Sequence, residues 1–310
     1  MTKSNKDISQ GICEMVTQKL LTLIEQGVTP WVRPWEASGY DEAISHTTGK
    51  PYSLLNQILL EFRSGEYLTF NQVKKEGGSV KKGAKTQIVV FWQCGRYMPV
   101  KIEDEEDSQD EDEKKEVWVS YHTPVLKYYR VFHINDCVGI KPRYAKEKDV
   151  VITYTNDPIE AAENVANDYC SRSGVTLRVC DSNKAYYQPF TDSVTVPKLS
   201  QFKETAEYYS TLFHELTHST GHKSRLNRLG NGTGIIVGLK EEYSREELVA
   251  EIGAAACLSR LGIENKKTTE NSAAYLENWA SFLKNDKKAF IVAAGRAEKA
   301  VELIFNSQTK

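Results

Sequence analysis

The chain has 310 residues, of which 40% are hydrophobic and 26% charged, and its formal net charge is −2. This length allows two domains of ordinary size, and the balance of apolar and charged residues excludes wholesale disorder and a fibrous repeat. No apolar run is long enough to cross a bilayer and the opening MTKSNKDISQ lacks the apolar core of a signal peptide, so we expect a cytoplasmic protein without a membrane partner.

The first half has the pattern of a mixed α and β domain. Apolar residues recur at three- and four-residue intervals from Asp7 to Gln26, which predicts an amphipathic helix. The stretch TPWVRPWEASGY follows as a loop, because its prolines cannot continue a helix. Residues 52–62 are expected to be helical, and residues 86–92 and 117–121 to be strands.

An acidic stretch and a linker divide the chain. Ten of the fourteen residues from Glu103 to Glu116 are acidic, which predicts a mobile, solvated loop inserted in a hairpin between the two strands. The glycine, proline and polar residues of 139–150 predict a linker. The expected domains are therefore residues 1–138 and 151–310.

The second half is expected to begin with a helix at 157–172 and three strands, VTLRV, AYYQPF and TDSVTV, and to close with helical stretches near 203–221, 244–261, 271–284 and 287–305. The whole chain is therefore predicted to be an α+β protein of two domains. We interpret TDSVTV as an edge strand, to which a peptide substrate could add by main-chain hydrogen bonds.

The segment FHELTHSTGH contains the pattern H-E-x-x-H, formed by His214, Glu215 and His218. On a helix, residues four apart share a face, so both imidazoles can bind one zinc ion while Glu215 acts as general base on a water molecule. This chemistry is typical of zinc-dependent hydrolases. His222 and Tyr243 are candidates for stabilising an oxyanion, and equally for packing or capping.

A zinc site of this kind needs a third protein ligand. Metzincins place a histidine six residues after the second one, but that position is Ser224, which excludes that class. The helix SREELVAEIGAAACL offers Glu246, Glu247 and Glu251 among apolar residues. We predict Glu247 as the third ligand and Glu251 as the residue that orients a ligand histidine from behind, with His222 as the rival third ligand.

Outside the acidic stretch the first half is basic, with thirteen Lys or Arg against nine Asp or Glu in residues 1–102. A basic groove with aromatic faces is typical of single-stranded nucleic-acid binding, although aromatic residues are as commonly part of a core. The candidates for such a surface are Trp31, Arg33, Trp35, Tyr52, Asn56, Lys81, Lys82, Lys85, Trp92 and Arg96.

Several of these motifs also resemble one known family over nearly the whole chain. They are TPWVRPW, PYSLLNQILL, YLTFNQVKKEGGSVKKGAKTQIVVFW, YYRVFHINDCVGI, FHELTHSTGHKSRLNR, YSREELVAEIGAAACLSRLGI and AAYLENWASFLKND. In this combination the chain resembles the ArdC family of antirestriction proteins of conjugative mobile elements. The acidic stretch of residues 103–116 is not part of that resemblance.

The resemblance implies a first domain that binds single-stranded DNA and a second domain with a zincin-like metallopeptidase fold. Carried over residue by residue, it implies one zinc ion held by His214, His218 and Glu247, with Glu215 catalytic. The implied role is protection of incoming DNA from restriction, with a protein substrate such as a host restriction component. The alternative is a DNA-binding antirestriction factor whose metal site is structural and cuts no peptide.

Overall fold

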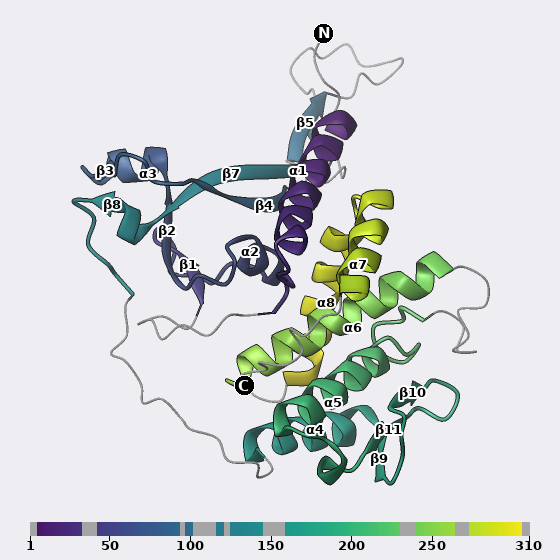
Figure 1. Ribbon diagram of the computed structural model, residues 1–310. Coiled ribbons are helices and arrows are strands. Elements are labelled where there is room, and N and C mark those ends of the chain that lie inside the picture. The colour runs from purple at the N-terminus through teal and green to yellow at the C-terminus, as the bar shows by residue number, and fades with distance from the viewer. Residues whose placement is uncertain are drawn as a thin grey trace, which may run out of the picture.

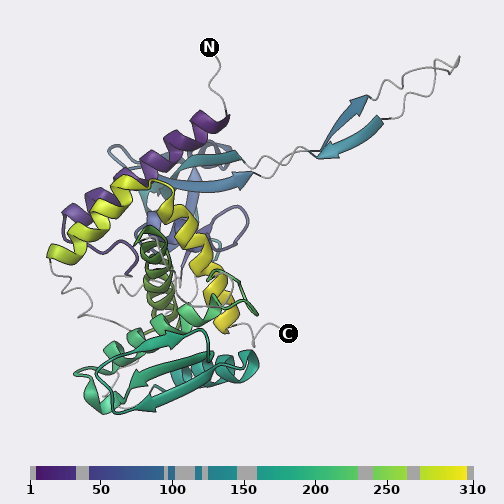
Figure 2. The same cartoon turned by 90° about the vertical axis from the view of Figure 1, so that its right-hand side faces the viewer.

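The computed structural model describes residues 5–32, 42–93, 97–101, 116–120, 125–144, 159–229, 240–263 and 273–305. The four-stranded sheet and the three-stranded sheet lie at opposite ends of the described structure, with a layer of long helices between them (Figures 1 and 2). None of the described helices is both long and apolar enough to cross a membrane.

The elements of the first half are α1 (Asn5–Glu25), β1 (Ala43–Ser45), α2 (Leu54–Leu59), β2 (Gly65–Thr69), α3 (Phe70–Lys75), β3 (Ser79–Val80), β4 (Gln87–Gln93), β5 (Tyr97–Lys101), β6 (Glu116–Ser120), β7 (Val125–His133), the 3₁₀ turn η1 (Ile134–Asp136) and β8 (Cys137–Val138). The main sheet has the order β1-β2-β7-β4, with β1 and β2 parallel and the other pairs antiparallel. The predicted opening helix, second helix and two strands are confirmed as α1, α2, β4 and β6.

The hairpin around the acidic stretch differs from the prediction in its partners. The strand β4 pairs with β7, with Val89 opposite Tyr129, whereas β6 pairs with β5. The β5–β6 hairpin projects away from the body of the protein (Figure 2). Residues 103–115 of the acidic stretch lie outside the described residues, and Glu116 begins β6.

The second half contains α4 (Glu160–Ser173), β9 (Thr176–Cys180), β10 (Tyr186–Gln188), β11 (Ser193–Pro197), the 3₁₀ turn η2 (Leu199–Gln201), α5 (Thr205–Thr220), α6 (Lys240–Arg260), α7 (Ala273–Asn285) and α8 (Ala289–Phe305). This order confirms every helix and strand predicted there. The sheet order β10-β11-β9 places β11 in the centre, so the interpretation of TDSVTV as an edge strand is wrong. All five residues of β11 are buried, and the strand beside α5 with a free edge is β10.

The two halves share one hydrophobic core. Apolar residues of α1, α2, β4 and β7 pack in the same cluster as residues of α6, α7 and α8. Trp31 is 2% exposed and contacts Trp279 and Phe290, with ring centroids 5.8 and 5.9 Å apart. A second core lies between α4, β9, β11 and α5. The position of the metal-site helix α6 is therefore fixed by contacts with both halves of the chain.

The beginning of the expected linker is fastened to the first half. The backbone N–H groups of Arg143 and Tyr144 donate to Glu66 Oε1 at 2.7 and 2.8 Å, and the Glu66 side chain is buried. Residues 145–150 lie outside the described residues. The domain boundary at 139–150 stays a prediction.

Candidate metal centre and nucleic-acid interface

The helix α5 carries the H-E-x-x-H residues on the side that faces α6. Its opposite side, with Tyr209, Leu212, Phe213 and Leu216, is buried in the second core, which fixes the rotation of the helix. The crossing with α6 is close because Gly253 faces Thr217, where an added Cβ would lie 2.6 Å from Thr217 Cγ2. A glycine at this position lets the two helices approach.

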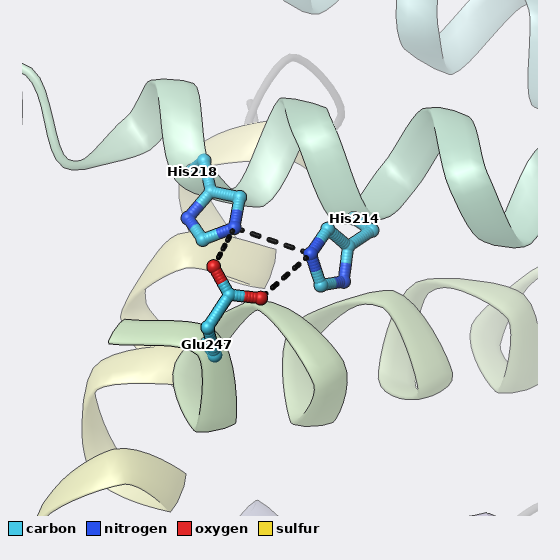
Figure 3. Close-up of side chains that lie close together, drawn as sticks. All are labelled: His214, His218 and Glu247. Atoms are coloured by element: carbon cyan, nitrogen blue, oxygen red, sulfur yellow. Dashed lines mark hydrogen bonds and ion pairs between the residues drawn. The ribbon is translucent and has the colours of Figure 1, made fainter. Parts of the chain in front are cut away.

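Three candidate ligand atoms converge between α5 and α6 (Figure 3). The Nε2 atoms of His214 and His218 are 3.1 Å apart, and each lies 3.5 Å from a carboxylate oxygen of Glu247. Ligand atoms bound about 2.0–2.2 Å from a tetrahedral ion are roughly 3.3–3.6 Å apart. The donor set and its spacing therefore fit one divalent ion, and it is the only such group among the described residues.

The charges around the histidines favour a cation. Burial alone would lower the pKa of His218, but hydrogen bonds with Glu246 and Glu247 outweigh burial and raise the pKa to about 9. Burial alone would raise the pKa of Glu247, but hydrogen bonds with His214 and His218 lower it well below its usual range. Glu247 is therefore an ionised carboxylate, as a metal ligand must be.

Behind His218 lies a buried ion pair of Glu246 and Arg228. The carboxylate of Glu246 accepts hydrogen bonds from Arg228 Nη2 at 2.7 Å and Nε at 3.1 Å, and its Oε1 lies 3.5 Å from His218 Nδ1. A carboxylate on the far nitrogen of a ligand histidine fixes the orientation of the ring. Glu246 makes this contact with His218, and the predicted role of Glu251, farther along α6, stays a prediction.

Glu215 is buried beside the two histidines, with 8% of its surface exposed. Burial raises the pKa of its carboxyl, and the nearby His214 and His218 and a hydrogen bond from the Tyr187 backbone N–H oppose that rise only in part. A carboxylate with a raised pKa is suited to take up and return a proton. The contact with Tyr187 also places Glu215 next to the edge strand β10.

His222 lies apart from the three converging atoms. Its Nδ1 is 2.7 Å from Ser224 Oγ and 4.0 Å from Asp192 Oδ2. The helix ends at Thr220, so His222 no longer continues the helical face, and the converging group contains Glu247 in its place. Tyr243 is in α6, but its side chain lies outside the described ones.

A second, partly exposed ion pair joins the turn between β10 and β11 to the segment after α5. Arg225 donates to both carboxylate oxygens of Asp192, at 2.5 and 2.9 Å, and Tyr187 Oη donates to Asp192 at 2.8 Å. Sequence patterns did not single out Arg225, Arg228 or Asp192. An isolated arginine or aspartate carries no periodic signal, and only the folded chain shows that these side chains form ion pairs.

Two of the predicted DNA-binding residues are part of the interior, which corrects their assignment. Trp31 packs in the shared core, and Asn56 is fully buried with its side chain bonded to the N–H and C=O groups of Val90 at 2.7 and 2.8 Å. Asn56 thereby covers the open edge of β4. Neither side chain has a surface that a nucleotide could contact, because both are buried.

The other predicted DNA-binding residues have mixed positions. Tyr52 is half-buried, Lys81, Lys82 and Lys85 are exposed, and Trp92 is 53% exposed. The ammonium group of Lys81 donates to the carbonyl of Asn135 at 2.8 Å, which tethers the start of the lysine loop to η1. The remaining candidates lie outside the described residues: Arg33, Trp35 and Arg96.

Two family models match the chain, one in each half. Residues 10–132 match the N-terminal domain of anti-restriction factor ArdC, and residues 164–296 match a zincin-like metallopeptidase. Two crystal structures of the antirestriction protein ArdC from plasmid R388, one metal-free and one bound to Mn(II), are each 29% identical with a TM-score of 0.67. They cover 94% and 96% of this chain, and 96% and 99% of their own.

Curated relatives include two DNA primases TraC of Escherichia coli, 30% and 31% identical over 98% and 99% of this chain. The chain spans only 28% and 20% of the length of these two relatives. The uncharacterized protein y4eC of Sinorhizobium fredii is 26% identical over 96% of the chain and 92% of its own length.

Fold and site together define a two-domain protein in which an ArdC-type N-terminal domain precedes a zincin-like metallopeptidase domain with a fitting divalent-metal site. Its two domains are those of an ArdC-like protein, and the chain is similar to the antirestriction protein ArdC from plasmid R388 over nearly its whole length.

Proposed function

We propose that the protein is a zinc-dependent peptidase that also binds single-stranded DNA and protects the DNA of a conjugative mobile element from restriction in the cytoplasm of a new host. One zinc ion per chain would be held by His214, His218 and Glu247. The observation that carries the peptidase part is the convergence of three ligand atoms beside a buried glutamate and the edge strand β10.

Zinc is the ion that two imidazoles and one carboxylate favour, although such a set also holds other divalent ions. A zinc ion held by His214, His218 and Glu247 would lower the pKa of water and polarise a substrate carbonyl. Glu215 takes a proton from the attacking water and delivers it to the amine nitrogen as the peptide C–N bond breaks, so water is added across that bond. The raised pKa of Glu215 supports both steps, since the carboxyl must accept a proton and then release it.

The edge strand β10 supports a peptide substrate. Its antiparallel partner β11 occupies one side, and an extended peptide could pair with the other side by main-chain hydrogen bonds. Tyr187, in the middle of β10, contacts Glu215, so a peptide paired there would pass the general base. The antirestriction role favours a host restriction component as the substrate.

A Glu215→Gln variant tests the peptidase against the alternative, a DNA-binding factor that cuts no peptide. We expect wild-type metal content together with loss of protection when unmodified DNA enters a restricting recipient, because the amide cannot take up a proton. Glu207→Gln, on the same helix, is the matched control. Full protection by Glu215→Gln would contradict the peptidase mechanism and favour the alternative.

The DNA-binding part is supported by the ArdC-type N-terminal domain and by the exposed Lys81, Lys82, Lys85 and Trp92. Titration of a labelled single strand at low and high salt tests it. Affinity should fall as salt rises, because cationic side chains release counterions from the phosphates. Binding that ignores salt, or that prefers duplex DNA, would contradict this part.

A further inference from the structure

The strands β4 and β7 form a ribbon whose two faces have different surroundings. On one face, Val89 and Val131 pack in a small cluster with Tyr67. On the other face, Val90 and Leu126 belong to the shared core under α1. Side chains alternate between faces along a strand. Phe91 and Tyr129 therefore share the face of Val89, whereas Trp92 and Tyr128 point to the other face.

A row of aromatic rings runs across the Phe91 face from the interior to the surface. The ring centroids of Tyr67 and Tyr52 are 6.2 Å apart, those of Tyr52 and Phe91 6.1 Å, and those of Phe91 and Tyr129 5.9 Å. Exposure increases along the row, from 1% at Tyr67 to 42% at Phe91 and 48% at Tyr129. The buried end fixes the row, and the two rings at its outer end are open to solvent.

The charged side chain next to the exposed rings is cationic. Lys127 lies directly opposite Phe91 in the ladder, so it shares the face of Phe91, and it is exposed. The sequences of β4 and β7, QIVVFWQ and VLKYYRVFH, contain no aspartate or glutamate. This face therefore presents an exposed aromatic pair next to a lysine. Such a surface is complementary to a ligand that has flat apolar faces and negative charges.

We propose that Phe91 and Tyr129 form a stacking platform for the bases of single-stranded DNA, with Lys127 positioned to contact the phosphates. This inference rests on the proposed DNA binding and assigns it a surface that the sequence motifs did not indicate. Aromatic side chains on adjacent strands of an open sheet are an established way to stack unpaired bases. Duplex DNA does not fit the platform, because its bases are already stacked on one another.

The test compares neighbouring tyrosines on opposite faces of β7. Tyr129→Leu and the double variant Phe91→Leu/Tyr129→Leu remove the stacking rings and keep apolar side chains on the strands. Tyr128→Leu is the matched control, because Tyr128 is 41% exposed and lies on the other face. Affinity for an oligo-dT strand of about 12 nucleotides is measured at low salt by fluorescence anisotropy. Thermal unfolding confirms that each variant is folded.

We expect the double variant to bind at least about tenfold more weakly than wild type, with Tyr129→Leu intermediate and Tyr128→Leu unchanged. On an abasic strand of equal length, wild type and all three variants should bind alike, since only the phosphate contacts remain. This comparison separates stacking from a general loss of charge or fold.

Two results would overturn the platform while DNA binding stands: wild-type affinity in the double variant, or an equal loss in Tyr128→Leu and Tyr129→Leu. Tight binding of duplex DNA through the same rings would overturn it as well. Failure of the wild-type protein to bind the strand at all would instead contradict the proposed DNA binding, so the two failures can be distinguished.

Discussion

Two clusters in this molecule consist of the same residue types, histidine and glutamate, but are arranged differently. In the candidate metal site, the Nε2 atoms of His214 and His218 and the carboxylate of Glu247 point at one another. In the first half, His46 lies between two carboxylates, with Nδ1 on Glu66 and Nε2 2.9 Å from Glu76. The first arrangement leaves room for an ion, and the second is complete without one.

The difference comes from how the side chains are presented. Residues four apart on α5 place two imidazoles on one face, and α6 supplies the carboxylate from across the crossing. Around His46, β2 and the end of α3 supply carboxylates to opposite nitrogens of a single ring, and Arg143 joins Glu76 at 3.0 Å. Composition alone therefore does not identify a metal site, because the directions of the ligand atoms decide.

The comparison predicts that substituting the two histidines changes the stability of the protein by different amounts. His46→Ala removes one member of a fully buried pair and leaves Glu66 without it, which should cost about 3–5 kcal/mol of unfolding free energy. His214→Ala should cost the metal-free protein much less, because its ring is partly exposed and Glu247 keeps its contact with His218. Urea unfolding in the presence of a chelator measures both. Equal losses would contradict the distinction between the clusters.

The Arg225–Asp192 pair is structural although it adjoins the metal site. Asp192→Asn keeps the left-handed backbone at φ 45°, which asparagine tolerates, but leaves the buried Arg225 without its carboxylate. We expect a loss of about 2 kcal/mol, at the low end for a buried pair because Asp192 is partly exposed. Chemical unfolding of both proteins at neutral pH provides the measurement.

This pair also predicts a pH dependence. Burial would raise the pKa of Asp192, but hydrogen bonds from Arg225 and Tyr187 outweigh it and lower the pKa. Because the folded pKa lies below the unfolded value of about 3.9, the stabilisation is present above that pH and is lost as pH falls through the folded pKa. The difference in stability between wild type and Asp192→Asn should therefore shrink below about pH 4. A constant difference down to the acid limit would contradict this account.

Glu246→Gln tests whether the carboxylate beside His218 contributes to metal affinity. The variant keeps the size of the side chain but removes the charge that faces His218 Nδ1 and Arg228. We expect metal affinity to fall about 10- to 100-fold. Competition with a chromophoric chelator measures the change, and Glu251→Gln is the matched control one turn away. A larger loss of metal affinity in Glu251→Gln would indicate that Glu251 orients a ligand histidine, as predicted from the sequence.

Gly253→Ala tests how closely the two helices must approach. The new methyl group would lie 2.8 Å from Thr217 Oγ1, and that buried hydroxyl already donates to Phe213 O at 2.7 Å. The crossing must widen, which costs about 1–3 kcal/mol and is partly offset by the better helix propensity of alanine. Metal affinity should fall severalfold, while the His46 cluster is untouched. Unchanged affinity would show that the ligands tolerate a wider crossing.

The periodic features of the fold were predictable from the sequence, and the contacts between distant segments were not. The opening helix, the strands of the second half and the four closing helices are all confirmed, because each has its own spacing of apolar residues. The convergence of Glu247 with the two histidines agrees with the prediction. Glu246 and Glu251 are five residues apart, about 140° around a helix, and the helix pattern alone does not show on which side His218 lies.

The burial of particular polar and aromatic residues also could not be predicted from the sequence. Trp31 and Asn56 are of residue types common on nucleic-acid-binding surfaces, but they lie in the interior. Likewise β11, interpreted as an edge strand, lies in the middle of its sheet. These outcomes depend on which segments meet in three dimensions: α7 and α8 cover Trp31, and the edge of β4 receives Asn56. Conversely, Phe91 and Tyr129 were not among the candidates, although the pairing of β4 with β7 brings them together at the surface.

The most direct test of the account is the metal content of the purified protein, measured by mass spectrometry for wild type, His214→Ala, Glu247→Ala and His46→Ala. We expect about one zinc ion per chain in wild type and in folded His46→Ala, and none in the other two variants. Wild-type protein without metal after purification free of chelators would contradict the site. Metal retained in Glu247→Ala but lost in His214→Ala would contradict the assignment of the third ligand.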